Sequence, residues 1–308
     1  MGQLKKSNMK ISVVITAYNV AEYIAECLNS VLGQSYQRIE IIVVDDCSTD
    51  GTAEIVREYA GKYGNIRVIR NEENKGAGMS RRIGIADATG EYTMLLDGDD
   101  YIKNADFIRD LVETAEKTDA DVVGGGITIL KEDGSWDATA YGECITEGIE
   151  KVSRFWGERI VFMNNKLIRT SLYEKVPYCG RRYIEDTPVI IPILWHANKV
   201  AYVNNVGYTY RMRPASLTHT TTRVKEIIYK GLCWLDLMDF FEECDKAVLN
   251  AVNVRGYLSN IINWLNAGPL SEEEVKPFAS DWQEFTRRLF ARIQIANVNI
   301  KEKKEAAK

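Results

Sequence analysis

The sequence predicts an α/β protein, with a mostly parallel sheet flanked by helices and a helical extension at the C-terminal end. Two observations lead to this fold class. Over the first hundred residues, short apolar runs rich in β-branched residues alternate with amphipathic stretches of helical period. The connections are too short to separate domains, so these runs are expected to form one sheet with helices on both faces. Beyond Thr222 the strand-like runs stop and helical periodicity takes over.

The elements of the first half follow from periodicity and from capping residues. The first apolar run is typical of a central parallel strand. Asn19 is a suitable N-cap for the amphipathic helix that follows, and Gly33 would end that helix. The same reasoning predicts strands at residues 10–16, 39–44, 66–69 and 92–96. It predicts a first helix between Asn19 and Gly33 that carries Ile24, Leu28 and Leu32, and further helices at residues 53–63 and 79–88.

The second half is less regular. The apolar residues 127–130 and the turn Asp133-Gly134 indicate an edge hairpin. Ser271 and Glu274 have the spacing of a capping box. Further elements are expected as a strand opening at residues 121–123, helices at residues 104–117, 189–195, 224–241 and 246–265, and an apolar helical face from residue 282 onward.

Polar residues close three of the expected strands, at the position where ligands of open α/β sheets bind. These ends carry Thr16-Ala17-Tyr18, Asp45-Asp46 and Asp97-Gly98-Asp99-Asp100. They are far apart in the sequence, but the fold would gather them on one rim. Three carboxylates within four positions repel one another unless a cation or polar solvation neutralises them. The sequence therefore predicts a divalent-cation site for a ligand at this rim.

Simpler explanations of these acids also exist. Asp50 and Asp100 could be only helix caps or turn formers. An EF-hand loop starting at Asp97 would lack its central glycine and its final carboxylate. A dinucleotide-binding fingerprint would start at Gly76 but would place Arg81 where close packing requires the third glycine. Neither motif therefore replaces the cation site.

The bulk composition excludes several classes of protein. Over 308 residues the net charge is −5, which disfavours a broad nucleic-acid surface, so no nucleic-acid partner is expected. The six cysteines include no pair at the two-residue spacing of zinc or redox sites. The sequence shows no signal peptide and no apolar run near the roughly 18 residues of a membrane span. A cytoplasmic location is the simplest expectation.

Three segments resemble the inverting family 2 glycosyltransferases of GT-A fold. They are SVVITAYN (12–19), EIIVVDDCSTDGT (40–52) and NKGAGMSRRIGIADATGEYTMLLDGDD (74–100). The resemblance is dense over residues 10–111 and thinner over 164–218. It implies a GT-A catalytic domain at residues 1–220, with a nucleotide-sugar half near 10–105 and an acceptor half near 106–220, and a helical region at 221–308.

The resemblance implies how the nucleotide would bind. Thr16 and Tyr18 match positions that hold the base, and Asp46 matches the carboxylate that accepts the uracil N3–H. A carboxylate there would face a lone pair on cytosine N3, so UDP is favoured over CDP, while dTDP and a guanine nucleotide stay open.

The resemblance also implies a metal and a counter-charge. Asp99 matches the ligand of Mn²⁺ or Mg²⁺, and Asp97 matches a contact to ribose or to a metal-bound water. Arg81 matches an arginine that offsets diphosphate charge. The family often has asparagine next, where this chain has Arg82, so which arginine faces the site stays open.

Catalysis is expected from a second acidic pair, Glu185-Asp186. Acids just before Pro188 could merely cap a helix. The resemblance implies instead that Asp186 is the catalytic base and that Glu185 contacts the acceptor or orients the base. His219 is a further candidate for the metal or the pyrophosphate, although a lone histidine in a threonine-rich loop is more often incidental.

The implied activity is the metal-dependent, inverting transfer of one sugar from a UDP-sugar to a hydroxyl of a glycan or polyprenyl-linked acceptor in bacterial capsular or exopolysaccharide synthesis. The Gln-x-x-Arg-Trp signature of processive synthases is replaced by Tyr208-Thr209-Tyr210-Arg211, so single addition is expected. A two-carboxylate hydrolase would need neither metal nor base pocket. The alternative from another class is a non-catalytic nucleotide-sugar-binding or interaction protein on the same fold.

The C-terminal helices raise the question of a membrane contact. Phe285, Leu289 and Ile293 fall on one helical face, with Arg287, Arg288 and Arg292 nearby. This face could pack on the rest of the protein. It could also touch an anionic membrane that carries a lipid-linked acceptor, which would place the protein peripherally on the inner face.

Overall fold

The computed structural model describes residues 8–157, 162–176, 186–213, 222–251, 254–268 and 270–306. The chain divides into two compact units, Met1–His219 and Thr220–Lys308, which are described separately. The first contains a sheet with helices on its faces, and the described part of the second is helical.

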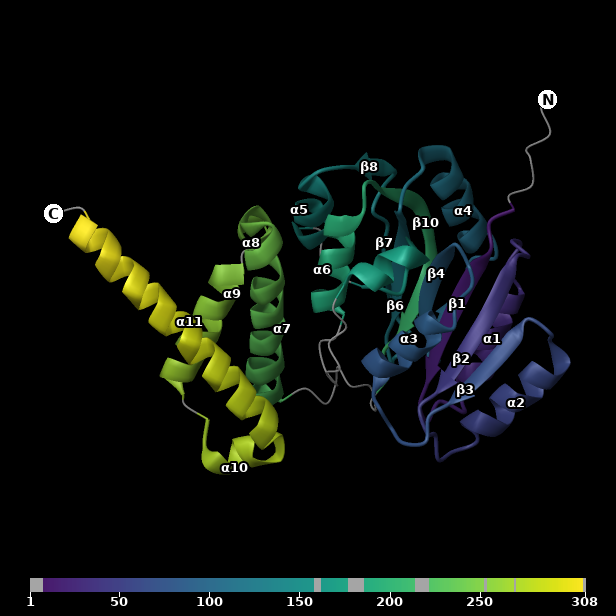
Figure 1. Ribbon diagram of the computed structural model, residues 1–308. Helices are drawn as coiled ribbons and strands as arrows, with labels where there is room; N and C mark the ends of the chain where they lie inside the picture. Colours follow the sequence, from purple (N-terminus) through teal and green to yellow (C-terminus); the bar gives the residue numbers. More distant parts are fainter. Residues whose placement is uncertain are drawn as a thin grey trace. The chain divides into compact units, whose positions relative to one another are not determined.

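The first unit is organised around a single sheet (Figure 1). Among the described residues it has ten strands, in the order β3-β2-β1-β4-β9-β6-β10-β5, while β7 pairs with β6 and β8 with β10. The strands are Ile11–Ala17 (β1), Ile39–Asp45 (β2), Ile66–Arg70 (β3), Tyr92–Asp97 (β4), Tyr101–Ile102 (β5), Val122–Leu130 (β6), Trp136–Thr139 (β7), Cys144–Thr146 (β8), Lys166–Arg169 (β9) and Val200–Arg211 (β10).

The predicted α/β class is confirmed, and the four strands expected in the first half are all present. The run β3-β2-β1-β4 is parallel throughout. Beyond β4 the sheet is mixed, because β9 pairs antiparallel with both β4 and β6, whereas β6 and β10 are parallel. Strands β1 and β2 are buried along their whole length, which explains their continuous apolar runs.

Helices cover both faces of the parallel half. Helices α1 (Ile24–Leu32) and α2 (Thr52–Lys62) contact each other, and α3 (Ala77–Ala86) packs on β1 and β2. Right-handed crossovers place α1 and α2 on one face. The strand order then reverses between β3 and β4, which places α3 on the other face (Figure 1). At Gly84 a Cβ would lie 2.3 Å from the Val14 side chain, so only glycine permits this close approach of α3.

The expected N-cap of the first helix is wrong. Helix α1 begins at Ile24, with Tyr23 at its N-cap position. Asn19 has a φ of 51° and instead lies in the loop after β1. Its side-chain Oδ1 accepts a hydrogen bond from the Thr49 N–H at 2.8 Å, so it ties this loop to the loop after β2. A short polar side chain that tolerates positive φ serves a turn as well as a cap, and the sequence did not distinguish the two.

The second half of the unit adds helices α4 (Phe107–Thr118), α5 (Glu150–Gly157) and α6 (Thr187–His196), and the 3₁₀ segment Thr170–Lys175. The expected hairpin is confirmed: β6 and β7 are antiparallel around a turn in which the Gly134 N–H donates to the Lys131 carbonyl. β6 itself is not an edge strand, because β9 and β10 flank it.

The described part of the second unit contains helices α7 (Arg223–Cys244), α8 (Lys246–Ala251), α9 (Val254–Ala267), α10 (Glu272–Val275) and α11 (Ala279–Ala306). Of the helix expected at 246–265, residues 246–251 and 254–265 are helical, and the two residues between them lie outside the described residues. The capping box is confirmed, because the Ser271 side chain accepts from the Glu274 N–H and the Glu274 carboxylate accepts from the Ser271 N–H.

The apolar face expected on the last helix packs against α7. Phe285 is fully buried beside Gly231, and Leu289 is buried as well. Arg288 pairs with Asp236 and Asp239, and Arg292 pairs with acids of the same helix. Phe285 and Leu289 therefore belong to the interior of the helical unit, and Arg288 and Arg292 are paired within it. Arg287 is exposed, and the membrane contact stays a prediction.

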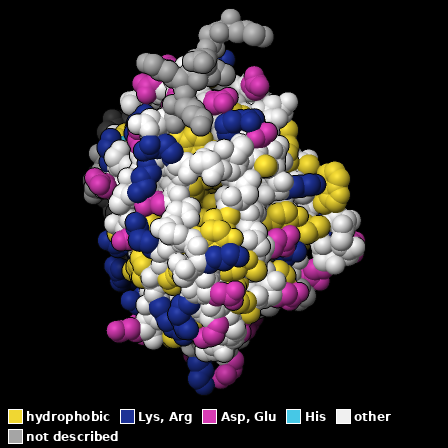
Figure 2. Space-filling view, turned by 90° about the vertical axis from the view of Figure 1, so that its right-hand side faces the viewer, with side chains coloured by type: hydrophobic (Ala, Val, Ile, Leu, Met, Phe, Trp, Pro, Cys, Tyr) yellow, Lys and Arg dark blue, Asp and Glu magenta, His cyan; other side chains and the backbone are white. Residues whose placement is uncertain are grey.

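The surface agrees with the charge balance of the sequence. Basic and acidic side chains are interspersed over the face shown in Figure 2. In the part of the chain that the structure describes, no helix combines the length and hydrophobicity needed to cross a bilayer.

Candidate active site

The candidate site lies at the carboxyl ends of β1 and β4, where the strand order reverses. Open α/β sheets bind ligands in the crevice at such a switch point. Thr16 and Asp97 are register partners at the ends of these strands, and the Thr16 hydroxyl donates to Asp97 Oδ1 at 3.0 Å. Tyr18 follows β1 with 43% of its surface exposed, so its ring is available to a ligand.

Arg81 joins the two acidic clusters that the sequence analysis singled out. Its Nη1 donates to Asp186 Oδ1 at 2.6 Å, and its Nη2 donates to Asp97 Oδ1 and Oδ2 at 2.9 and 3.1 Å. Arg81 is only 5% exposed, whereas its neighbour Arg82 points to solvent. Of the two arginines, Arg81 is therefore the one that contacts Asp97 and Asp186, and its role beside the diphosphate stays a prediction.

Asp186 occupies the N-cap position of α6, but its side chain does not cap the helix. The carboxylate pairs with Arg81 instead, so helix capping does not account for this residue. Burial raises the pKa of Asp186 and the charge of Asp97 raises it further, while Arg81 and Lys166 act in the opposite direction; the net pKa is above that of an ordinary aspartate. A carboxyl with a raised pKa at a ligand crevice is a candidate general base.

Asp97 is the most heavily bonded acid of the rim. Besides Thr16 and Arg81 it accepts a hydrogen bond from Asn164 Nδ2 at 2.8 Å. Burial alone would raise its pKa, but the Arg81 charge and these hydrogen bonds outweigh burial and lower the pKa of Asp97. Asp97 is therefore held ionised.

A buried hydrogen-bond chain runs on from Asp97. Asn164 Nδ2 also donates to the Tyr208 hydroxyl at 3.1 Å, and that hydroxyl donates to Asp100. Asp100 accepts the Arg211 N–H at 2.8 Å as well. The simpler reading of Asp100 as a helix cap is wrong, because its partners come from β10. The acidic loop is thereby fastened to the acceptor half of the unit. Asp50, by contrast, accepts the Thr52 N–H at the start of α2.

Asp99 faces the crevice beside two arginines. Arg213 Nε donates to Asp99 Oδ2 at 2.5 Å, and Arg211 Nε donates to the Asp99 carbonyl at 3.0 Å. Burial raises the pKa of Asp99, and repulsion from Asp97 adds to that effect, while Arg213 opposes it. A cation near Asp99 would relieve this repulsion.

Asp46 lies at the end of β2, 3% exposed. It accepts hydrogen bonds from Asn71 Nδ2 at 2.7 Å and from the N–H groups of Lys75 and Gly76, both at 2.8 Å. It therefore fixes the loop before α3, whose helix carries Arg81. A carboxylate has about four acceptor positions, so one is left for a ligand.

Two of the expected site residues, Glu185 and His219, lie outside the described residues. Four side chains of the network were given no role by the sequence analysis: Asn164, Tyr208, Arg211 and Arg213. The segments 164–166 and 210–216 do match the resembled family, which was the available signal, but only contacts across the sheet reveal what these side chains do.

Comparison with known proteins identifies the family. The model of glycosyl transferase family 2 matches residues 12–177, more than half of the chain. The glycosyltransferase GlyG of Streptococcus pneumoniae is 33% identical over 221 residues, which are 68% of this chain and 73% of GlyG. The chain belongs to glycosyltransferase family 2. EpsJ of Bacillus subtilis, an uncharacterized glycosyltransferase, is 33% identical over 68% of this chain, which spans 62% of EpsJ.

The fold of this family 2 glycosyltransferase has close structural neighbours. Staphylococcus aureus TarS residues 1–349, in complex with UDP-GlcNAc, superimpose with a TM-score of 0.67 over 91% of this chain and 82% of that chain, at 23% identity. This likeness supports the GT-A fold expected from the sequence. The expectations of a family 2 member and of a glycosyltransferase are confirmed.

The hydrogen bonds of the Tyr208 hydroxyl to Asn164 and Asp100 give a first prediction for this glycosyltransferase. In Tyr208→Phe, Asn164 and the buried Asp100 lose the hydroxyl that joins them. We expect the free energy of unfolding to fall by about 1–3 kcal/mol, the usual cost of an unsatisfied buried group. Urea denaturation measures it. The matched control is Tyr101→Phe, whose hydroxyl has no partner among the described residues. Equal stability of the two variants would contradict the role assigned to Tyr208.

Proposed function

We propose that this protein transfers one sugar, with inversion, from a UDP-sugar to a hydroxyl of a glycan or lipid-linked acceptor, using Mn²⁺ or Mg²⁺. The observation that carries the proposal is the Arg81 bridge between Asp97 and Asp186. It brings the candidate base to the crevice in which a nucleotide-sugar would bind. The segments on either side of that crevice come from different halves of the unit, as a donor and an acceptor require.

The nucleotide half fits a uridine. The exposed ring of Tyr18 offers a stacking face, and Thr16 and Asp97 lie beside it at the strand ends. The remaining acceptor position of Asp46 suits an N–H donor such as uracil N3. The UDP-GlcNAc complex of TarS, a structure of the same fold, supports a UDP-sugar donor.

The acidic loop fits a divalent cation that is shared with the donor. Among the described residues no group of three or more His, Cys, Asp or Glu side chains could hold a metal ion by itself. Mg²⁺ and Mn²⁺ commonly take one or two carboxylates and complete their shell with phosphate and water. Asp99 would supply such a carboxylate, since among the described side chains Arg213 bonds its Oδ2 and none bonds its Oδ1. When bound, the ion would neutralise charge on the leaving diphosphate.

The chain's own groups supply the remaining chemistry. Asp186 accepts the proton of the acceptor hydroxyl, and its raised pKa brings it closer to that task than an ordinary aspartate. Attack from the face opposite the diphosphate inverts the anomeric carbon. Arg81 keeps Asp186 and Asp97 close despite their repulsion. TarS is named a poly(ribitol-phosphate) β-N-acetylglucosaminyltransferase, and a cell-surface polymer is accordingly the acceptor class that we infer.

Calorimetry of UDP binding tests the metal assignment. We expect Mn²⁺ or Mg²⁺ to tighten UDP binding by about 10- to 100-fold, a coupling of ordinary size between two adjacent ligands. Asp99→Ala should remove this coupling. Asp87→Asn, at the opposite end of the strands, serves as the control. UDP affinity that stays equally high without metal and in Asp99→Ala would refute the assignment.

A non-catalytic nucleotide-sugar-binding protein on the same fold is the alternative. A turnover measurement distinguishes this alternative from an enzyme. A panel of UDP-sugars is incubated with the protein and Mn²⁺, and slow donor hydrolysis is followed by release of UDP. An enzyme should release UDP from one donor faster than from the others, and Asp186→Asn should slow that release. Binding without any release would favour the alternative.

A further inference from the structure

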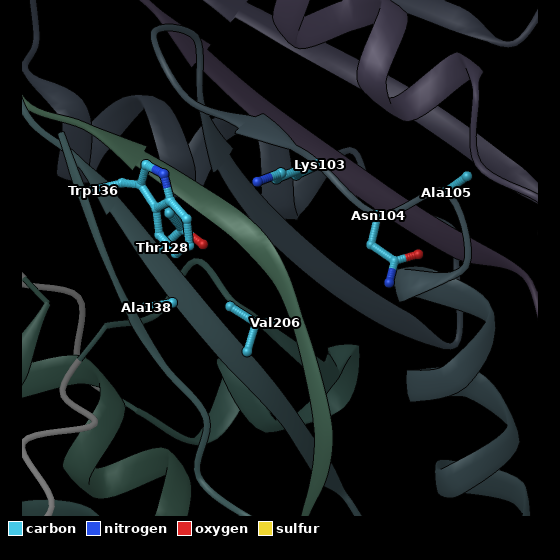
Figure 3. Close-up of a pocket in the computed structure, with 7 residues that line it drawn as sticks. All are labelled: Lys103, Asn104, Ala105, Thr128, Trp136, Ala138 and Val206. Atoms are coloured by element: carbon cyan, nitrogen blue, oxygen red, sulfur yellow. The ribbon is translucent and has the colours of Figure 1, made fainter. Parts of the chain in front are cut away.

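A pocket of the first unit lies on the sheet away from the acidic strand ends. Its volume is about 470 Å³, within the range of small-ligand sites. It is lined by residues from four segments: Lys103, Asn104 and Ala105 after β5, Thr128 on β6, Trp136 and Ala138 on β7, and Val206 on β10. Figure 3 shows Trp136 and Lys103 on opposite sides of the β10 ribbon, with the lysine side chain directed toward the indole.

The strand register explains how these residues meet. Trp136 pairs with Leu130 and Ala138 with Thr128 across β7 and β6, and Thr128 pairs with Thr209 on β10. Register partners share a face, and so do residues two apart on one strand. The indole, the Thr128 hydroxyl and the strand pairs between them therefore belong to a single face of the sheet. The strands thus fix four of the seven lining residues, and the loop after β5 supplies the other three.

Three side chains give the pocket its chemistry. Trp136 is 59% exposed, and the Lys103 Nζ lies 5.2 Å from the centroid of its ring. Within the described part of the chain Lys103 makes no ion pair, so the aromatic ring is its partner. Thr128 is only 6% exposed yet lines the pocket, and no described side chain or backbone group bonds its hydroxyl. Since the Thr128 hydroxyl is not among the buried atoms that lack a partner, it reaches the solvent-filled pocket and is open to a hydrogen bond with a ligand or water.

This combination matches a sugar ring. A pyranose has one face of C–H groups, which is attracted to the negative face of an indole, and a rim of hydroxyls that bond donors and acceptors. Trp136 supplies the ring face, while Thr128 and Lys103 supply the polar partners at its edge. An acyl chain would leave the ammonium and the hydroxyl unused, because Ala138 and Val206 are the main aliphatic side chains of the lining. A phosphate would be held by a single cation.

The pocket is also connected to the acidic crevice. Leu130, the register partner of Trp136, pairs on its other side with Arg211, whose Nε donates to the Asp99 carbonyl. Lys103 follows Asp100 by three positions. Two strand pairings thus link Trp136 on β7, through β6, to Arg211 on β10, and Arg211 bonds the acidic loop.

We propose that this pocket binds a pyranose unit of the acceptor glycan, stacked on Trp136 and bonded by Thr128 and Lys103. That the bound sugar belongs to an acceptor rests on the proposed transferase function. The existence of the sugar site does not depend on that function. The protein would then bind the acceptor glycan at a site separate from the one that binds the reacting hydroxyl. Trp136 is a binding residue and takes no part in the transfer itself.

The test uses the full-length protein labelled with 5-fluorotryptophan, in which Trp136→Phe assigns the Trp136 resonance. The probes are the methyl β-glycosides of glucose, galactose and N-acetylglucosamine. We expect at least one of them to shift the Trp136 resonance saturably. Trp136→Phe keeps an aromatic ring. Trp136→Ala removes it and should weaken binding of that glycoside by about 2- to 10-fold, the contribution of an aromatic stacking contact. The affinity is measured from the NMR signals of the glycoside itself. Thr128→Val and Lys103→Met should each weaken it as well.

Matched controls separate this site from the rest of the protein. Lys131→Met, on the same hairpin but paired with Asp137, should leave glycoside affinity unchanged. Trp136→Ala should leave UDP affinity and donor hydrolysis unchanged, so failure of the transferase proposal would be seen independently. The absence of a saturable shift with all three glycosides would overturn the sugar site. So would a change of UDP affinity in Trp136→Ala, or conversion of a dimer to a monomer by that variant, which would mark the face as a contact between copies.

Discussion

Asp186→Asn is expected to slow sugar transfer by about 10²- to 10⁴-fold, the usual contribution of a general base. Asparagine has the same shape but does not take up the proton of an acceptor hydroxyl. The fold should survive, because Arg81 keeps Asp97 as its partner and the repulsion between the two acids disappears. Affinity for UDP should therefore be retained. Rates from UDP release in the presence of acceptor, together with calorimetry, give both quantities.

The control for this variant is Asp87→Asn. Asp87 also pairs with an arginine, Arg67, but lies at the opposite end of the strands. Its replacement should leave the rate unchanged. Retained turnover in Asp186→Asn would remove Asp186 as the base, and loss of UDP binding would indicate a structural role.

The pH dependence of transfer follows from the same environment. The base acts in its deprotonated form, so the rate falls as pH drops through the pKa of Asp186. Because burial raises that pKa, the acid limb of the rate profile should lie above the range of an ordinary aspartate, near 3.9. The rate of Asp186→Asn, where measurable, should lack this limb.

Arg81→Met should have the second large effect. It leaves two partly buried carboxylates, Asp97 and Asp186, without their shared cation. Breaking a fully buried pair on one side costs about 3–5 kcal/mol of stability, and for this partly buried pair we expect a smaller loss in the same direction. Loss of the Arg81 charge also raises the pKa of Asp186, so the acid limb of any remaining activity should move to higher pH. Denaturation in urea and the pH profile measure the two effects separately.

Two further variants make the Arg81 test specific. Arg82→Met removes a neighbouring but exposed charge and should change neither stability nor rate. Arg81→Lys restores a charge but lacks the planar fork that reaches both carboxylates, so it should recover part of the stability and little of the transfer. Arg81→Met as stable as Arg82→Met would show that the bridge is not a structural element.

The parallel half of the sheet could be predicted from the sequence alone. Its buried parallel strands are continuous apolar runs, and such runs between short amphipathic helices allow few alternative folds. The acids at the strand ends could be placed on one rim because every parallel strand of that half ends on the same edge. The resemblance to family 2 then supplied roles for Thr16, Tyr18 and Asp99 that the residues alone do not specify.

The tertiary structure decided the side-chain partners. Arg81 could be paired with Asp186, 105 positions away, only after the two halves were folded together. Asp100 could be a cap in the sequence and is instead a partner of Tyr208 across the sheet. Asn19 could be a helix N-cap in the sequence and instead bonds the Thr49 N–H of a neighbouring loop. Local patterns fix backbone periodicity, but contacts between distant strands depend on register and order, which no local segment contains.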